Sequence, residues 1–364
     1  MISMLESTVE EPENLPTYQK GFHYEDKIRQ MPYRNFGRTG LQVSLLGFGG
    51  SELAFCHGTP KEEEGIMTVV EAIKSGINYI DTAPYYGHGK AETVLGKALK
   101  RLPRNAYFIA TKVGRYGPNV EELFDFSADR ITRSVEESLI RLGLDAVDVL
   151  LAHDIEYAAS TDIIVNETLP TLQKLKDAGK TKFIGITGYP LRLLKEVLMK
   201  SSVQIDVILS YCRCTLFDDT LKSYIPYFKE KNVAVVSAAG LGMGLLTNGG
   251  PPDWHPVEVE IKEACREAAE YCSARNVNIA KLAAHHCYVQ PDINVHLIGM
   301  EKKHLLEVNL DTLFNGLTPH EMAVKEEIFQ KYFSPLPKNH WEDKDVIKYW
   351  EELKKVSSSR TSPT

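Results

Sequence analysis

The chain has 364 residues, a formal net charge of −7 and 9% aromatic residues, which is an ordinary composition for a globular protein. The acidic balance argues against nucleic acid or an anionic membrane as the main partner, because either requires a basic face. No apolar run approaches the roughly 18 residues of a membrane span, and the acidic start lacks the features of a signal or transit peptide. We therefore expect a cytoplasmic protein, long enough for one large barrel or two ordinary domains.

The first 31 residues are polar, acidic and without clear periodicity, and we expect an extension that is loose or packed on the surface. Glycines at positions 37 and 40 then predict a small hairpin, after which apolar runs alternate with helical patterns. The predicted strands cover residues 43–50, 77–80, 107–112, 147–153, 183–187, 207–211, 233–238 and 295–299. The helices predicted before the second to eighth strands cover residues 62–75, 90–101, 128–142, 161–178, 191–200, 221–231 and, as a pair, 258–274 and 279–289.

Eight apolar strands separated by amphipathic helices indicate an α/β protein with a parallel sheet, and eight such units suit a closed (β/α)8 TIM barrel. We expect the barrel domain to span residues 32–333, with extra C-terminal helices at 302–312 and 320–332. A tail at 334–364 should hold one charged helix, 342–355, before a disordered Ser/Thr end. A doubly wound dinucleotide fold is disfavoured, because neither glycine-rich stretch, 47–52 or 240–246, completes Gly-x-Gly-x-x-Gly.

The cysteines are scattered along the chain and show no Cys-x-x-Cys spacing, so we expect free thiols. They are Cys56, Cys212, Cys214, Cys265, Cys272 and Cys287. Only two clusters could attract a metal, namely Cys212-x-Cys214 and His285-His286-Cys287. A single residue between thiols is poor spacing for chelation, and the second cluster lies in a helical pattern. We interpret both clusters as structural and expect no metal.

Ionisable residues follow three consecutive apolar strands: Asp81, Lys112 and His153, with Tyr86 in the loop after the first of them. In a barrel the carboxyl ends of the strands meet at one mouth, so these side chains can pair there. We expect Tyr86 to exchange a proton with a substrate oxygen, Lys112 to lower its pKa, Asp81 to orient Lys112, and His153 to hydrogen-bond the same oxygen. Singly they could be a loop-capping aspartate, a rim lysine or a core histidine, but jointly they favour chemistry.

A proton donor without an activated nucleophile or a metal suggests a hydride partner, which points to a nicotinamide cofactor. The stretches that carry these residues resemble the aldo-keto reductase family from about residue 33 to 317. They are Asp81-Thr82-Ala83 with Tyr86-Gly87, then Ala110-Thr111-Lys112, then the strand ending in His153. Within the family the chain is most similar to the L-galactose dehydrogenase branch, through residues 124–127, 153–156, 183–188, 207–212 and 244–247.

The resemblance implies a catalytic tetrad of Asp81, Tyr86, Lys112 and His153, with NAD or NADP extended across the barrel mouth. The cofactor contacts that it implies are Gly49, Gly50, Asp81, Thr187, Gly188, Ser210, Leu241, Gly244, Gly299, Met300, Lys302, Lys303 and Asn309. The sequence departs from the family pattern at several of these sites. Thr187-Gly188 replaces a Ser-Asn pair, Ile208 a glutamine, Ala238 a stacking aromatic, and Leu305 the arginine that clamps a 2′-phosphate.

Glu301 should repel a 2′-phosphate, whereas Lys302 and Lys303 should attract one, so NAD is only slightly preferred. The main hypothesis is an oxidoreductase that interconverts an alcohol or hemiacetal and a carbonyl or lactone, as an aldose dehydrogenase does. Alternatives are an aldehyde or ketone reductase, and a non-catalytic nicotinamide-binding regulatory subunit similar to potassium-channel β subunits. Glycoside hydrolysis needs two carboxylates, and only Asp81 can be placed. We expect a small-molecule sugar or carbonyl substrate and a monomer or weak homo-oligomer.

Overall fold

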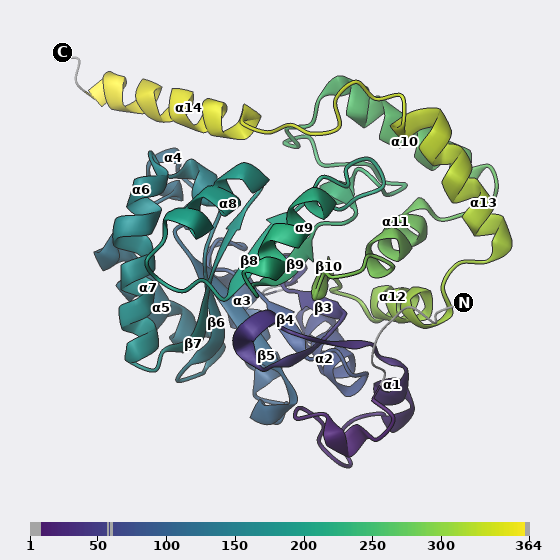
Figure 1. Ribbon diagram of the computed structural model, residues 1–364, viewed down its shortest axis with the longest axis horizontal. Coiled ribbons are helices and arrows are strands. Elements are labelled where there is room, and N and C mark those ends of the chain that lie inside the picture. The colour runs from purple at the N-terminus through teal and green to yellow at the C-terminus, as the bar shows by residue number, and fades with distance from the viewer. Residues whose placement is uncertain (1–8, 57, 59–60, 361–364) are drawn as a thin grey trace.

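The computed structural model describes residues 9–56, 58 and 61–360, and its centre is a closed barrel of eight parallel strands (Figure 1). The order around the barrel is β10-β3-β4-β5-β6-β7-β8-β9. The strands are β3 (Leu46–Gly49), β4 (Tyr79–Asp81), β5 (Phe108–Val113), β6 (Val147–Ala152), β7 (Thr181–Gly188), β8 (Val207–Tyr211), β9 (Ala234–Ala238) and β10 (Val295–Gly299). The predicted (β/α)8 fold is therefore confirmed.

Helices surround the barrel, and α5 shows why the sequence forms them. Its apolar residues recur at helical spacing and are buried against the sheet, from Ile131 to Leu142, and Gly143 ends it with φ of +68°. The helices are α1 (Glu25–Gln30), α2 (Glu62–Lys74), α3 (Lys90–Leu99), α4 (Val120–Leu123), α5 (Ala128–Leu142), α6 (Thr161–Ile163), α7 (Leu169–Asp177), α8 (Leu191–Lys200), α9 (Leu221–Glu230), α10 (Val259–Ser273), α11 (Ile279–Tyr288), α12 (Lys303–Asn315), α13 (Pro319–Ile328) and α14 (Lys344–Arg360). No helix in the described part of the chain has the length and hydropathy needed to cross a bilayer.

Side chains on each strand alternate between the barrel interior and the layer of helices. Tyr79 and Val149 belong to the interior cluster, whereas Ile80 and Leu150 pack with the helices. A residue two positions after an interior side chain therefore faces the axis of the barrel. This alternation directs Asp81 and the other polar residues in the same phase into the carboxyl-end mouth.

The opposite end of the barrel is closed by the predicted hairpin, in which β1 (Tyr33–Asn35) pairs antiparallel with β2 (Gln42–Ser44). Between the two strands, Phe36 is fully buried and packs 5.2 Å from the ring of Tyr79, inside the barrel. An apolar plug fills this end. Small molecules can therefore reach the barrel axis only from the carboxyl-end mouth.

The N-terminal extension contains more structure than its composition indicates. A 3-10 helix at Pro12–Asn14 and α1 pack on the barrel, and Leu15 and Ile28 are buried. The hydroxyl of Thr17 accepts a hydrogen bond of 3.0 Å from the Asn78 side chain. Helix α1 was missed because two turns are too short to show a convincing 3.6-residue period.

The C-terminal segment, residues 334–360, runs from α13 along the rim of the open mouth to α14 (Figure 1). Trp341 is 2% exposed and stacks 4.9 Å from the ring of Tyr189, which follows β7. Tyr349 on α14 packs on Phe124 and Tyr157, from the loops after β5 and β6. The predicted charged helix is confirmed. The predicted disorder is wrong for residues 356–360, which extend α14, and residues 361–364 lie outside the described part.

Candidate active site

The structure brings Asp81, Lys112, Tyr86 and His153 together at the open mouth. The Lys112 ammonium donates hydrogen bonds to the Asp81 carboxylate, to the Tyr86 hydroxyl at 3.2 Å and to the Thr82 carbonyl at 2.9 Å. Lys112 is 1% and Asp81 3% exposed. All three ammonium hydrogens thus have acceptors, which is the condition for keeping a charged lysine in a buried site.

Tyr86 reaches Lys112 because the loop after β4 turns back over the strand end. The turn needs left-handed backbone at Gly87 (φ +60°) and Gly89 (φ +89°). A Cβ at position 87 would lie 2.7 Å from the Cβ of Ala54, so glycine is also required for space. This loop leaves Tyr86 half-buried, with its ring within 4.9 Å of the lysine nitrogen.

His153 continues β6, and its backbone N–H donates to the Val113 carbonyl at 2.8 Å. Its ring stands at 90° to the Tyr86 ring, with the centroids 5.9 Å apart. Burial lowers the pKa of His153 to about 3, although the neighbouring Asp154 opposes the shift. The imidazole is therefore neutral at physiological pH. Its buried Nδ1 has no hydrogen-bond partner among the described residues.

The electrostatics correct one prediction. Burial raises the pKa of Tyr86 above its ordinary value, and the Lys112 ammonium opposes this shift without reversing it. The predicted lowering is therefore wrong as a net effect, because the desolvation of the phenolate outweighs its attraction to Lys112. Burial also disfavours charge on Lys112, but the adjacent Asp81 and Tyr86 raise the pKa of Lys112. The resting pair is a neutral phenol beside an ammonium.

A second polar network, which the sequence analysis missed, lies beside His153. Arg115 forms an ion pair of 2.6 Å with Asp154, and its guanidinium lies 3.7 Å from the centre of the Tyr85 ring. The hydroxyl of Thr187 accepts a hydrogen bond of 2.9 Å from the Asp154 backbone. Thr187, a predicted cofactor contact, is thus already engaged in positioning the loop after β6.

Glu156, in the same loop, is another residue that the sequence analysis missed. Its Oε1 accepts hydrogen bonds from the Tyr189 backbone at 2.9 Å and the Tyr211 hydroxyl at 3.3 Å. Its Oε2 is buried without a partner among the described residues, 2.8 Å from where a Cβ at Gly188 would lie. Burial raises the pKa of Glu156 to about 8. The glycine at 188 therefore makes room for a neutral carboxyl group at the rim.

The other predicted cofactor contacts lie mainly on one arc of the rim, at the ends of the neighbouring strands β9, β10 and β3. The backbones approach closely here: a Cβ at Gly50 would lie 2.9 Å from the Asp81 carbonyl, and one at Gly299 only 2.7 Å from the Glu52 side chain. The arc comprises Gly49, Gly50, Leu241, Gly244, Gly299, Met300, Lys302 and Lys303. Glycine is required at positions 50 and 299, because neighbouring protein atoms already fill the space that a side chain would take.

Two predicted contacts lie differently. Ser210 alternates with the interior residue Leu209, so it faces the helix layer rather than the mouth, and its buried hydroxyl has no partner among the described residues. Asn309 on α12 donates to the Leu305 carbonyl and accepts from the Tyr288 hydroxyl, each at 2.8 Å. Both ends of its side-chain amide are thus used within the protein.

The sequence profile of the aldo/keto reductase family matches residues 45–329 of the chain. The chain belongs to the aldo-keto reductase family. It is 48% identical over 286 residues to the L-galactose dehydrogenase of Arabidopsis thaliana. The aligned region covers 78% of this chain and 88% of the relative. It is 35% identical over 254 residues to the D-arabinose 1-dehydrogenase of Saccharomyces cerevisiae, covering 66% and 74% of the two chains.

Among solved structures, the holo form of an aldo-keto reductase from Bacillus halodurans matches with a TM-score of 0.65 and 27% identity, over 82% of this chain and 96% of that one. This aldo-keto reductase is therefore an NAD(P)-dependent oxidoreductase. The predictions of the family, of a similarity to L-galactose dehydrogenase and of a nicotinamide cofactor are confirmed. The predicted cofactor contacts at the end of β3 lie next to Asp81 on β4, because these two strands pair.

Proposed function

We propose that this aldo-keto reductase oxidises an aldose at its anomeric carbon to the lactone, with L-galactose as the first candidate substrate. The similarity to an L-galactose dehydrogenase and a D-arabinose 1-dehydrogenase supports a sugar substrate. The single observation that carries the proposal is the buried chain of contacts from Asp81 through Lys112 to the Tyr86 hydroxyl. This chain places one proton-transferring group, the Tyr86 hydroxyl, beside the Lys112 ammonium at the open end of the barrel. The other end of the barrel is filled by apolar side chains.

In this proposal the phenolate form of Tyr86, reached by loss of its proton to solvent, accepts the proton of the anomeric hydroxyl and becomes the neutral phenol. A bound nicotinamide supplies the hydride acceptor. Lys112 stabilises the phenolate that is present before this transfer, and Asp81 keeps Lys112 charged and pointed at the phenol oxygen. The neutral His153 hydrogen-bonds the reacting oxygen and fixes its position. In the reverse direction the neutral phenol donates its proton to the substrate oxygen. Lys112 donates a hydrogen bond to the phenol oxygen, so the hydroxyl proton of Tyr86 is free to point toward the substrate.

Groups beside the tetrad can bind the hydroxyls of a sugar. Arg115 Nε and Glu156 Oε2 are both buried without partners among the described residues. Polar atoms in such positions are costly unless a ligand completes their hydrogen bonds. The pair offers one donor and, as a neutral carboxyl, one further donor or acceptor. This supports a substrate rich in hydroxyls over a simple aldehyde.

NAD is the proposed cofactor. The position of the phosphate-clamping arginine is Leu305, and the Lys302 ammonium is paired with Glu301 at 3.1 Å. The carboxyl of Glu52 lies near Glu301, and the two repel each other strongly enough to contribute to the raised pKa of Glu52. Two carboxyl groups at this end of the arc disfavour a 2′-phosphate.

The test is a panel of aldoses and aldehydes with NAD and NADP in both directions, followed by the nicotinamide absorbance. We expect the highest kcat/KM for the oxidation of L-galactose with NAD. Efficient reduction of simple aldehydes with no oxidation of any aldose would contradict the proposal and favour the reductase alternative. Binding of the cofactor, measured by protein fluorescence, without turnover of any panel member would favour the regulatory alternative.

A further inference from the structure

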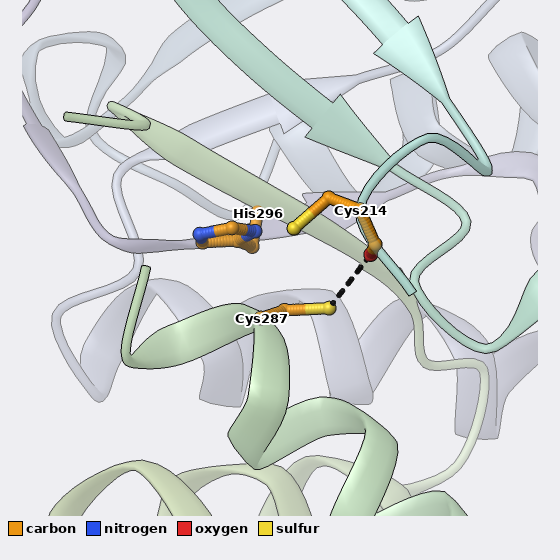
Figure 2. A group of neighbouring side chains, drawn as sticks. All are labelled: Cys214, Cys287 and His296. Atoms are coloured by element: carbon orange, nitrogen blue, oxygen red, sulfur yellow. Dashed lines mark hydrogen bonds between the residues drawn. The ribbon is translucent and has the colours of Figure 1, made fainter. Parts of the chain in front are cut away.

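We propose that Cys214, Cys287 and His296 form a Zn²⁺ site between the barrel wall and the helix layer. Cys214 lies in the loop after β8, Cys287 on α11 and His296 on β10 (Figure 2). One ligand atom from each lies within 4.8 Å of the other two, and all three residues are buried. His296 alternates with the interior residues Val295 and Leu297, so its ring faces away from the active-site axis.

The surroundings of His296 indicate a bound metal ion independently of the two thiols. It is 2% exposed, and neither ring nitrogen has a hydrogen-bond partner among the described residues. A buried imidazole with both nitrogens unpaired is destabilising and rare in native proteins. Figure 2 shows the edge of the ring that carries a nitrogen directed toward the Cys214 sulfur. A metal ion bound to that nitrogen would provide the missing partner.

The spacing of the three ligand atoms suits a single ion. With Zn–S bonds of about 2.3 Å and a Zn–N bond of about 2.0 Å, ligand atoms around one tetrahedral ion lie about 3.5–4 Å apart. Side chains already within 4.8 Å of one another need only small adjustments to reach this geometry. The Cys287 thiol now donates to the Cys214 carbonyl at 3.4 Å. Deprotonation of that thiol would free the carbonyl oxygen as a fourth ligand.

The charge balance favours a divalent ion such as zinc. Binding would release the two thiol protons to solvent, and two thiolates, one neutral imidazole and Zn²⁺ sum to zero charge. A neutral centre suits a buried site, whereas Cu⁺ with the same ligands would leave a buried negative charge. Calcium and magnesium require oxygen ligands that this cluster lacks.

The consequence would be a structural cross-link. Cys214 and Cys287 are 73 residues apart in the sequence, and the ion would tie the β8 loop and α11 to the last strand of the barrel. Each cysteine comes from one of the two sequence clusters, but neither cluster contributes a pair. The site lies behind the barrel wall, so zinc would stabilise the fold without entering the reaction.

The test uses the full chain expressed with added zinc and, separately, with added cobalt. We expect one zinc per chain by mass spectrometry, a thiolate-to-cobalt charge-transfer band, and loss of both in Cys214→Ser and Cys287→Ser. Cys265→Ser and Cys272→Ser remove other buried thiols and should keep both signals. Wild-type protein with less than a tenth of an equivalent of metal and no charge-transfer band would overturn the proposal. A signal retained in Cys214→Ser would do so as well.

A second measurement needs no variant, in case the serine substitutions prevent folding. The X-ray absorption spectrum of zinc in the wild-type chain should fit a first shell with two sulfur atoms and at least one nitrogen. A shell of nitrogen and oxygen only would place any bound zinc elsewhere and overturn the assignment.

Discussion

Both ends of the barrel bury carboxyl groups, but these groups differ in how many hydrogen-bond partners they have. At the closed end, Asp148 accepts from Lys182 at 2.9 Å, from Arg104 at 2.8 Å and from the Ile109 backbone at 3.0 Å. Asp206 is held in the same way, by a lysine at 3.0 Å and a backbone N–H at 3.1 Å. Each of these carboxylates links different segments of the chain, and both of its oxygens accept hydrogen bonds.

At the open mouth the corresponding groups are left incomplete. Asp81 Oδ2, His153 Nδ1, Arg115 Nε and Glu156 Oε2 are buried and without partners among the described residues. A protein leaves buried polar atoms unpaired only at a cost, which a ligand can recover on binding. The buried carboxyl groups of the two ends therefore differ in their unsatisfied hydrogen bonds rather than in burial itself.

The largest effect should come from Tyr86→Phe, which removes the proton-transferring hydroxyl from the open end. We expect kcat to fall by about 10³-fold, within the range for the loss of a general acid or base, with unchanged cofactor binding and melting temperature. Tyr85→Phe is the matched control, because Tyr85 precedes Tyr86 in the same loop but its ring packs on Arg115. Steady-state kinetics decide the matter: equal turnover of Tyr86→Phe and wild type would remove Tyr86 from the mechanism.

Lys112→Met should cost nearly as much, and it tests the electrostatics of the mouth. Lys112 opposes the burial that raises the pKa of Tyr86, so its loss should raise that pKa further. Oxidation requires the phenolate, and its pH profile should therefore move to higher pH, with about a 10²-fold loss at neutral pH. Lys112→Arg keeps the charge and should retain more of the original profile. A Lys112→Met profile that overlays that of the wild type would show that Lys112 does not tune the phenol.

At the closed end the loss should appear in stability instead. Asp148→Asn leaves Lys182 and Arg104 without their carboxylate, and we expect about 1–2 kcal/mol less free energy of unfolding in urea, because both cations are exposed enough to be solvated. The kcat of the folded variant should stay within about twofold of the wild type, because the site lies at the far end of the strands. Asp81→Asn should show the opposite pattern, with kinetics affected more than stability. If the two variants lost kcat and free energy of unfolding in the same proportion, the proposed difference between the two ends would be wrong.

The sequence predicted the barrel because its strands and helices have local periods. The bounds of α5, α8 and β8 agree with the prediction, and α5 ends at a local signal, Gly143. What the sequence analysis missed depends on tertiary contacts. Trp341 looks like an isolated residue in a proline-interrupted tail, yet it is buried against Tyr189 from 152 residues earlier in the chain.

The same distinction applies to the candidate site. Asp81, Lys112 and His153 could be found because each follows an apolar run. An ionisable residue in that position stands out in the sequence alone. Glu156 and Arg115 occupy ordinary loop positions. Their importance comes from burial and from the missing side chain at Gly188, which only the folded chain reveals. The net pKa of Tyr86 was mispredicted for a similar reason, since the extent of burial cannot be read from spacing.

Glu156→Gln should have the smallest effect, and it sharpens the comparison by asking whether a carboxyl at the open end is neutral. Burial raises the pKa of Glu156 from about 4.5 to about 8, so between these values the unfolded chain binds fewer protons than the folded one. The stability of the wild type relative to the glutamine variant should therefore fall as pH rises from 5 to 8 and level off above 8. Melting temperatures of both proteins across this range measure the difference. Parallel curves would mean that the Glu156 carboxyl group is ionised in the folded chain and would contradict this prediction.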